Sequence, residues 1–219
     1  SSDADIQGRD VRTGPMQVEC SVFCRGQALG PLKLKLPGRH SATNALAAVA
    51  VGLELEVPFS LLVDSLASFA GIHRRLEIKG EPARIMIIDD YGHHPAEIQA
   101  TLTAIRESWN RPLTVIFQPH RYSRTRDLFS DFLSAFDGAD HVVLTEIYPA
   151  GEDPIPGVRA EGLYQALKRR GHLDVEFVAE RDEIPARLAP RLRKGDVVLT
   201  LGAGDIYKVG ERLLESLQP

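Results

Sequence analysis

The chain has 219 residues, 43% of them hydrophobic, which is enough for one large domain or for one domain with part of another. Its formal net charge of -4 at pH 7 leaves no basic excess to neutralise a phosphate backbone, which argues against nucleic acid as a partner. The most apolar run, residues 45–57, is interrupted by Glu54 and Glu56 and is shorter than the about 20 residues that cross a bilayer. Since neither a signal core nor an Arg-rich transit pattern follows Ser1, we expect a piece of a cytoplasmic protein.

The first part of the chain predicts a small α+β region. From Met16 to Leu36 apolar and polar residues alternate with period two, which is the pattern of an antiparallel hairpin with one solvated face. Cys20 and Cys24, the only cysteines, share one face of this hairpin, and we expect them to be reduced and packed as small apolar residues. Two helices are predicted next, at residues 41–51 and 59–66. We expect the sheet that they cover to need strands from further upstream.

After Gly71 strands alternate with helices, which predicts a doubly wound, mostly parallel α/β sheet over residues 72–219. Five strands are expected, at residues 83–89, 113–117, 141–145, 175–178 and 197–201. The helices between and after them carry apolar residues at helical spacing, which we expect to face the sheet. These residues are Ile98, Leu102, Ile105, Leu128, Phe132, Phe136, Ile184, Leu188, Leu192, Ile206, Val209 and Leu213.

Dense polar sequences follow four of the predicted strands. They are DDYGHHP, QPHRYSR, TEIYPAGE and GAGD, and the opposite rim carries no comparable cluster. In an open parallel sheet, ligands bind beyond the carboxyl ends of the strands, because the loops converge there and helix amino termini point outward. The sequence therefore predicts an active-site edge at these four strand exits.

The first exit combines two carboxylates and two imidazoles, at Asp89, Asp90, His93 and His94. Such a cluster can bind a divalent metal, transfer protons or hold a polar ligand. The alternative is a capped turn, with Asp89 accepting hydrogen bonds from backbone amides and His94 near a helix amino terminus. We favour the capped turn for these two residues, and a functional role for Asp90 and His93.

The second exit places Arg121 and Arg124 three residues apart directly after a strand. Their guanidinium groups could converge on one anion, and the planar fork of arginine matches a carboxylate with two hydrogen bonds. A solvated basic loop is the alternative, and it suits Arg126 better than the other two. The GAGD turn lacks the spacing of a dinucleotide fingerprint, and the sequence contains no Gly-x-x-x-x-Gly-Lys-Ser/Thr phosphate loop.

Six strings of this sequence resemble the Mur ligase family: LPGRHSATNALAA, SFAGIHRRLE, DDYGHHPAEI, FQPHRYSRT, LTEIYPAGEDP and TLGAGDIYKVGE. The resemblance runs from about Asp3 to Leu217, and DDYGHHP together with FQPHRYSRT points to the branch that joins L-alanine to UDP-N-acetylmuramate. Members of the family have a UDP-sugar domain, a central ATPase domain and a carboxyl-terminal domain for the incoming amino acid. The resemblance implies that residues 1–71 are the end of the central ATP-binding domain. Residues 72–219 would be the carboxyl-terminal, Rossmann-like, amino-acid-binding domain.

The reaction that the resemblance implies belongs to peptidoglycan synthesis in the bacterial cytoplasm. ATP and Mg serve to phosphorylate the carboxylate of UDP-N-acetylmuramate, and the amine of L-alanine then attacks the acyl phosphate. The phosphate loop and most Mg ligands are expected in an upstream part of the family's chain. We therefore expect an ATP-dependent ligase of which these residues alone are inactive.

The resemblance also implies roles for residues that match the family's motifs, without any metal ligand among them. For ATP, the adenine would lie near His40 and Asn44, the phosphates at Arg75 and the ribose hydroxyls at Asp90. Ser41 stands where the family usually has Asn, which bears on the adenine assignment only. L-alanine would be surrounded by Tyr91, His93, His120, Arg121 and Arg124. Among these, the catalytic candidates are His93, Arg121 and Arg124, and the two arginines would take the carboxylate of L-alanine.

Two other functions fit the same residues. One is a metal-dependent phosphoesterase built on the Asp and His side chains of the first exit, which should retain a metal ion and act without a partner chain. The other is a non-catalytic module that binds a nucleotide or an amino acid and performs no reaction.

Overall fold

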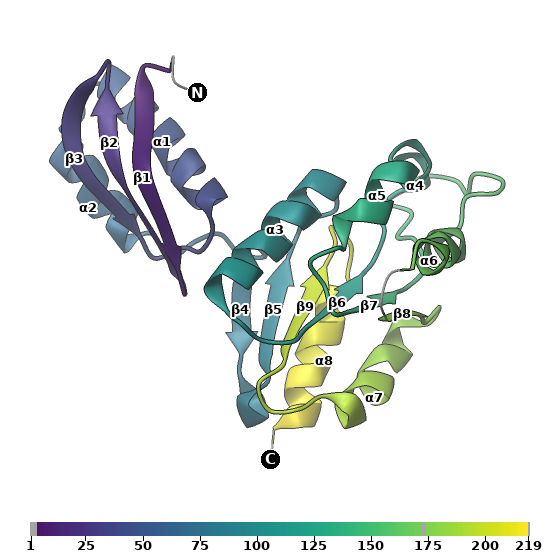
Figure 1. The fold of residues 1–219 in the computed structure, drawn as a ribbon. Coiled ribbons are helices and arrows are strands. Elements are labelled where there is room, and N and C mark those ends of the chain that lie inside the picture. Colours follow the sequence, from purple (N-terminus) through teal and green to yellow (C-terminus); the bar gives the residue numbers. More distant parts are fainter. Residues whose placement is uncertain (1–3, 172–173, 219) are drawn as a thin grey trace. The chain divides into compact units, whose positions relative to one another are not determined.

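The computed structural model describes residues 4–171 and 174–218, which form two compact units (Figure 1). One unit runs to Ile72 and includes Thr103–Asn110, and the other holds His73–Leu102 and the chain from Arg111 onward. The smaller unit contains a three-stranded sheet and the larger one a six-stranded sheet. Each unit therefore has its own sheet and core.

The smaller unit is an antiparallel sheet with two helices against one face. Its strands β1 (Ile6–Gly14), β2 (Gln17–Cys24) and β3 (Gln27–Leu34) are joined in chain order. The helices are α1 (Arg39–Glu54) and α2 (Phe59–Ser68). Alternate residues of β2 and β3 pair and are buried against α1, which confirms the predicted hairpin.

Strand β1 was not predicted, because its sequence IQGRDVRTG has no clean alternation and its pairing with β2 is interrupted by an irregularity between Arg9 and Arg12. Since β1 belongs to this chain, the expectation that the helices cover strands from further upstream is wrong for this three-stranded sheet. Cys20 is buried, Cys24 is half-buried and both are free thiols, as expected. Burial raises the pKa of the Cys20 thiol.

The larger unit is a mostly parallel α/β sheet, as predicted. Its strands lie in the order β4-β5-β9-β6-β7-β8, and only β4 is antiparallel to its neighbour. The strands are β4 (Glu77–Gly80), β5 (Met86–Asp90), β6 (Leu113–Phe117), β7 (His141–Leu144), β8 (Asp174–Phe177) and β9 (Val197–Leu201). The central strands are buried on both faces, which is why they read as continuous apolar runs.

Helices cover both faces of this sheet (Figure 1). On one face lie α3 (Pro95–Ser108), α4 (Tyr122–Asp127), α5 (Phe129–Ala135) and α6 (Ala160–Arg169). On the other lie α7 (Ile184–Leu188) and α8 (Tyr207–Leu217). Short 3₁₀ turns occupy Pro82–Arg84, Arg181–Glu183 and Ala189–Arg191.

The predicted apolar stripes form the core of the larger unit. On the α3 and α5 face, the Phe117 ring lies 5.6 Å from that of Phe132 and 5.1 Å from that of Phe136, measured between ring centroids. On the α8 face, Val209 and Leu213 are buried against β5 and β9. These two layers hold the strands of the sheet in fixed register.

The carboxyl ends of four strands lie at one level. Asp90 of β5 pairs with Leu201 of β9, Leu201 pairs with Phe117 of β6, and Phe117 pairs with Leu144 of β7. The loops that follow these strands therefore start side by side along one edge of the sheet. This edge collects the four polar sequences that were predicted to meet.

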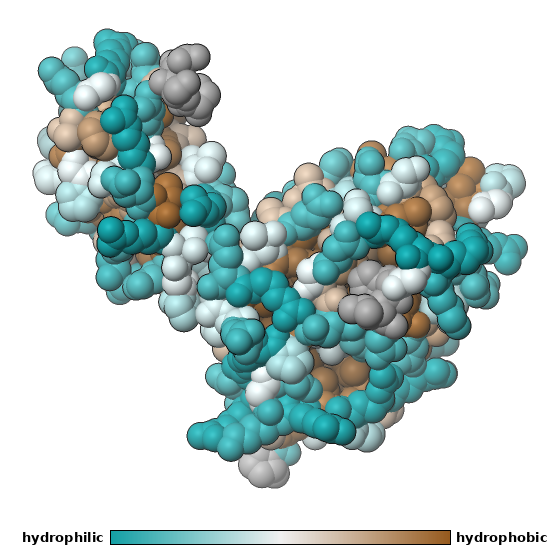
Figure 2. Space-filling model, viewed as in Figure 1, coloured by the Kyte–Doolittle hydropathy of each residue, from teal (hydrophilic) through white to brown (hydrophobic). Residues whose placement is uncertain are grey.

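The surface is mainly hydrophilic on the side of the larger unit that Figure 2 displays, with small apolar areas between the polar ones. The most exposed large apolar side chains of the described residues lie elsewhere, in the smaller unit, at Val51, Leu55, Leu61, Phe69 and Ile72. No helix among residues 4–171 and 174–218 has the length and apolar character needed to span a membrane.

Candidate functional site

Four aromatic rings from three strand exits form a row along the polar edge. The Tyr91 and His93 rings, after β5, meet edge to face with centroids 5.5 Å apart. The His93 ring lies 5.5 Å from the ring of His120, which follows β6. His120 in turn stacks on Tyr148, after β7, at 5.6 Å. Loops that lie far apart in the sequence thus contribute neighbouring rings to one continuous row.

Backbone hydrogen bonds hold the loops after β6 and β7 together. Tyr148 N–H donates to Pro119 O at 2.8 Å, and Arg121 N–H donates to Tyr148 O at 2.9 Å. Arg121 has a φ of 75°, a left-handed conformation that costs a non-glycine residue about 1–3 kcal/mol and persists only where its surroundings impose it. The paired loops therefore fix the start of α4, with Arg121 at its amino end and Arg124 on the helix.

The two arginines lie beside His120, on different partners. Arg124 Nη1 donates to His120 O and to His120 Nδ1, both at 3.0 Å. Arg121 Nη1 lies 3.9 Å from a carboxylate oxygen of Glu152, and its side chain is half-exposed. Glu152 also accepts hydrogen bonds from the Ser123 amide and hydroxyl, which hold its pKa below the usual range. Arg124 is thus held against the row of rings, while the Arg121 head group has one loose partner, Glu152, among the residues that the structure describes.

His120 is uncharged at neutral pH. Burial, reinforced by electrostatic repulsion from His93, Arg124 and Arg121, lowers its pKa from 6.5 to about 4. Because a guanidinium can only donate hydrogen bonds, Nδ1 of His120 must accept the bond from Arg124, and the ring proton lies on Nε2.

We expect ¹⁵N NMR titration of the His120 ring to give a midpoint near pH 4, and Arg124→Gln to raise that midpoint by removing one of the cations. Between about pH 4 and 6.5 the folded chain binds fewer protons at this position than the unfolded chain, so stability falls as the pH drops through this window. His120→Gln should remove that part of the pH dependence. A midpoint that Arg124→Gln leaves unchanged would show that the two side chains do not interact.

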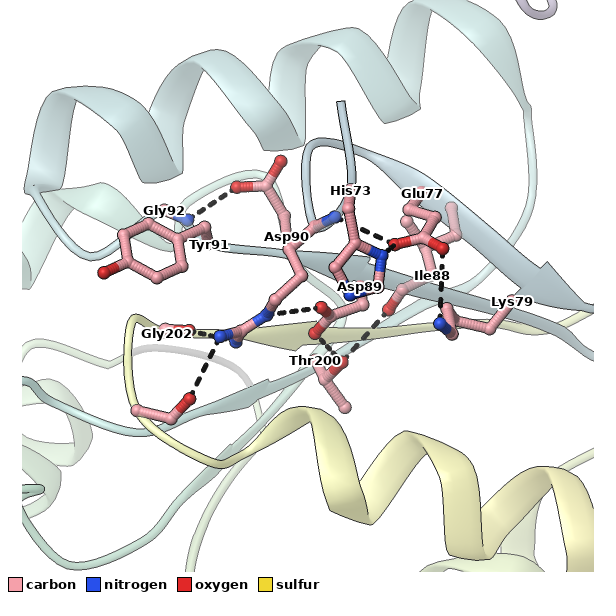
Figure 3. Close-up of polar contacts among 12 residues, drawn as sticks. His73, Glu77, Lys79, Ile88, Asp89, Asp90, Tyr91, Gly92, Thr200 and Gly202 are labelled. Atoms are coloured by element: carbon pink, nitrogen blue, oxygen red, sulfur yellow. Dashed lines mark hydrogen bonds and ion pairs between the residues drawn. The ribbon is translucent and has the colours of Figure 1, made fainter. Parts of the chain in front are cut away.

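The two aspartates that end β5 do not divide their roles as the sequence suggested. Asp89, expected to cap a turn, instead receives Arg74 Nε at 2.9 Å on one oxygen and the Thr200 hydroxyl at 2.6 Å on the other. Asp90 accepts the amides of Gly92 at 2.7 Å and Leu76 at 2.8 Å, and so it is Asp90 that caps the turn. Figure 3 shows Asp89 directed to Thr200 and Asp90 to Gly92. Burial raises the pKa of Asp90 despite these amide bonds.

The amino terminus of α3 is capped by Glu97, whose carboxylate accepts the amides of His93 at 3.0 Å and His94 at 3.2 Å. Burial by itself would raise the pKa of Glu97. The two amide hydrogen bonds, together with His93 and Arg75, outweigh burial, so the pKa lies below its usual value. His94 lies at this helix terminus, as the capped-turn reading expected, and its Nδ1 accepts the Ala96 amide at 3.3 Å.

The acidic and imidazole groups of this exit do not form a metal site. In the described part of the chain, no three His, Cys, Asp or Glu side chains are arranged to hold a metal ion. The Asp89 and Asp90 oxygens already accept hydrogen bonds from Arg74, Thr200 and backbone amides. This arrangement gives the phosphoesterase alternative no support.

The candidate ATP residues fall in both units. Arg75 is half-exposed in the larger unit, with its guanidinium 3.8 Å from Glu97 and 5.6 Å from the Tyr91 ring centroid. His40 and Asn44 lie one turn apart on the exposed side of α1 in the smaller unit. Between them, buried Ser41 donates its hydroxyl to Pro37 O at 2.7 Å, which gives the unusual serine a local structural role.

Two further features border the row of rings. Gly204, in the GAGD turn, packs so closely that an added Cβ would lie 2.7 Å from the Tyr148 ring, so this turn requires glycine for close approach. An open hollow of about 440 Å³ adjoins Tyr122, the residue after Arg121. Its walls are Tyr122, Glu146 and residues 154–159.

Sequence reasoning missed Arg74. Its guanidinium is mostly buried and pairs with Asp89. It also donates to the carbonyls of Gly202 and Gly204, which lie about 130 positions further along the chain. The doublet Arg74-Arg75 was the only available signal, and the sequence does not reveal which of the two turns inward.

A doubly wound sheet with arginines, imidazoles and helix termini along its carboxyl edge defines an open α/β domain, the class of fold in which ligands bind beyond the carboxyl ends of the strands. The family model described as "Mur ligase, glutamate ligase domain" matches residues 74–204, and this chain belongs to the Mur ligase family. The resemblance of the six sequence strings is thereby confirmed.

Individual relatives agree with this family. The chain is 48% identical over 218 residues to a UDP-N-acetylmuramate–L-alanine ligase of Trichlorobacter lovleyi, covering 99% of this chain and 48% of that protein. It is 47% identical over 219 residues to the enzyme of the same name from Geobacter sulfurreducens, covering 100% of this chain and 47% of the relative. The crystal structure of UDP-N-acetylmuramate-alanine ligase from Thermotoga maritima superposes with a TM-score of 0.85 at 30% identity, over 99% of this chain and 46% of that one. The chain spans about half the length of these relatives.

Proposed function

We propose that this chain supplies the amino-acid-binding surface, and part of the ATP-binding surface, of a ligase that joins L-alanine to UDP-N-acetylmuramate in the bacterial cytoplasm. The observation that carries the proposal is the meeting of His93, His120, Arg121 and Arg124 at one sheet edge. The relatives named UDP-N-acetylmuramate–L-alanine ligase support the substrate assignment. In this proposal residues 72–219 are the amino-acid-binding domain, and residues 1–71 belong to the central ATP-binding domain.

The arginines would fix the carboxylate of L-alanine. Arg121 is half-exposed and Arg124 is held in place by His120, so an incoming carboxylate could receive charged hydrogen bonds from both. Holding the carboxylate orients the amine, and orientation lowers the barrier by removing translational and rotational freedom in advance. The uncharged His120 ring adds no competing positive charge at neutral pH.

His93 is placed to accept the proton that the amine must lose. Its Nδ1 lies 3.0 Å from Tyr91 O, and because a carbonyl only accepts hydrogen bonds, Nδ1 carries the proton. In the neutral ring this leaves Nε2 as a free acceptor, which is the form that a general base requires. Tyr91 would form the adjoining wall of the amino-acid pocket.

ATP would supply the phosphoryl group that activates the carboxylate of UDP-N-acetylmuramate, with Mg as its counterion. Arg75 fits a role at the phosphates, because its guanidinium is accessible and only loosely paired. Asp90 fits the ribose less well, because both of its oxygens accept backbone amides and its side chain is 4% exposed. His40 and Asn44 are accessible on α1, as contact with adenine would require.

Calorimetry with the purified chain tests this proposal against its rivals. We expect weak, saturable binding of L-alanine that Arg121→Ala weakens by about tenfold to a hundredfold, and no hydrolysis of a phosphoester. Tight binding of L-alanine or ATP without dependence on other domains would favour a receptor-like module, and metal-dependent phosphoester hydrolysis would favour the phosphoesterase. In a longer protein that contains the whole ligase, phosphate release should require both L-alanine and UDP-N-acetylmuramate.

A further inference from the structure

The Arg74 side chain connects the exits of β5 and β9. Its Nε donates to Asp89 Oδ2 at 2.9 Å, its Nη2 to Gly202 O at 2.7 Å and its Nη1 to Gly204 O at 3.1 Å. Only 15% of the side chain is exposed. The acceptor Asp89 is itself fixed by Thr200, whose hydroxyl donates to Oδ1 at 2.6 Å, as Figure 3 shows. Each of the three guanidinium nitrogens therefore has its own acceptor, a set that the fork of arginine satisfies and the single ammonium of lysine does not.

The backbone around Arg74 is held in an unfavourable conformation. Arg74 has a φ of 59° and Leu76 a φ of 47°, both in the left-handed region that costs a non-glycine residue free energy. Three hydrogen bonds offset that cost: Tyr91 N–H to Arg74 O at 2.7 Å, Leu76 N–H to Asp90 Oδ2 at 2.8 Å, and Arg74 N–H to Glu77 Oε2 at 2.8 Å. The segment is thereby fastened to the residues that immediately precede the row of rings.

The same guanidinium lies against two tyrosine rings. The Arg74 Cζ atom is 5.1 Å from the Tyr91 ring centroid and 4.7 Å from that of Tyr207, within the range of a cation–π contact. On another side, the Tyr91 ring meets His93. Although Tyr91 is 37% exposed, its ring is thus located between a fixed cation and the first histidine of the row.

We propose that Arg74 is a positioning residue that sets the Tyr91 ring and, through it, determines which amino-acid side chain the site accepts. This inference rests on the proposed function, in which Tyr91 forms a wall of the amino-acid pocket. By binding Gly202 and Gly204 as well, Arg74 fixes the β9 turn and the Tyr91 ring relative to each other. A small shift of either one changes the space left for the ligand side chain.

The test compares Arg74→Lys with Arg111→Lys in the full chain. Lysine keeps the charge at position 74 but cannot satisfy three acceptors arranged around a planar fork. Arg111 is a matched control, because it is also mostly buried and also joins loops through backbone carbonyls, at Gly195, Arg84 and Asp196. It lies at the opposite end of the same sheet, away from Tyr91.

The first readout needs no ligand. We expect Arg74→Lys to move the NMR signals of the Tyr91 and Tyr207 rings, and Arg111→Lys to leave them in place although it also lowers stability. The second readout is the ratio of L-alanine to L-valine affinity. Arg74→Lys should reduce this ratio by about tenfold, because the free energy of one hydrogen bond corresponds to about tenfold in affinity. In a Tyr91→Leu background, Arg74→Lys should have no further effect on this ratio.

Each outcome decides the question. Unmoved Tyr91 signals in folded Arg74→Lys would overturn the inference, and so would a lower stability with an unchanged affinity ratio, since a purely structural arginine predicts that result. If Arg74→Lys does not fold, Asp89→Asn loosens the same guanidinium and is read in the same way. If the unmodified chain binds neither amino acid, the proposed function fails, while the ring signals still decide whether Arg74 sets Tyr91.

Discussion

Asp89→Ala should destabilise the larger unit by about 3–5 kcal/mol, because it leaves the mostly buried Arg74 guanidinium without its charged partner. The change also removes the shorter of the two hydrogen bonds of the buried Thr200 hydroxyl, which is left with Ile88 O at 3.3 Å. Urea unfolding should be followed through the amide signals of β5 and β9, so that the larger unit is measured separately from the smaller one. A double variant that adds Arg74→Met should recover part of the lost stability, since it removes the uncompensated charge.

The matched control for this prediction is Asp137→Ala. Asp137 also pairs with an arginine, Arg170, but both side chains are largely exposed, and exposed pairs contribute about 1 kcal/mol or less. We therefore expect a much smaller shift of the unfolding midpoint. If Asp89→Ala and Asp137→Ala lower the free energy of unfolding equally, the Arg74–Asp89 pair is screened by solvent and does not stabilise the sheet edge.

Arg121→Ala should weaken the binding of L-alanine by about tenfold to a hundredfold, the loss expected when one charged hydrogen bond worth about 1.5–3 kcal/mol disappears. In a protein that contains the whole ligase, the KM for L-alanine should rise far more than the KM for ATP. The structure sharpens this prediction, because the Arg121 head group has only a 3.9 Å approach to Glu152 and its removal leaves the buried network intact. Stability should therefore stay nearly unchanged.

Arg126→Ala is the matched control for this loss. Arg126 lies on the same short helix and pairs with exposed Asp127, outside the row of rings. We expect it to leave the affinity for L-alanine unchanged. If Arg126→Ala and Arg121→Ala reduce affinity alike, the arginines act as a general positive field. If the KM values for L-alanine and ATP rise equally, Arg121 is not the carboxylate ligand.

The central strands were predictable because they are buried on both faces. Residues 113–117 and 197–201 read as apolar runs with a single threonine in each, and the structure has β6 and β9 at these bounds. β4 escaped prediction because it is a four-residue edge strand, Glu-Ile-Lys-Gly, with every residue only half-buried. Helix α6 was missed although Leu163 and Leu167 are buried, because its stripe is short and follows a long loop.

The location of the candidate site at one edge of the sheet was predictable, but the hydrogen bonds between its side chains were less so. Parallel strands in register bring their exits together, so the meeting of the loops that carry His93 and His120 followed from topology. Topology did not predict that Asp90, and not Asp89, would cap the turn. Adjacent strand residues point to opposite faces, and the sequence does not say which face holds a buried arginine. Arg74 could not be placed at all, since its acceptors depend on the packing of the last strand.

That last strand has a consequence for how the protein is made. β9 pairs with β5 on one side and with β6 on the other, so residues near the end of the chain form the middle of the sheet. While residues 118–196 are being translated, β5 and β6 each have an edge that β9 does not yet cover, and nascent chains with unpaired strand edges are prone to wrong associations. The carboxyl edge of the sheet is complete only once β9 pairs with both β5 and β6, so this edge forms late in the assembly of the larger unit.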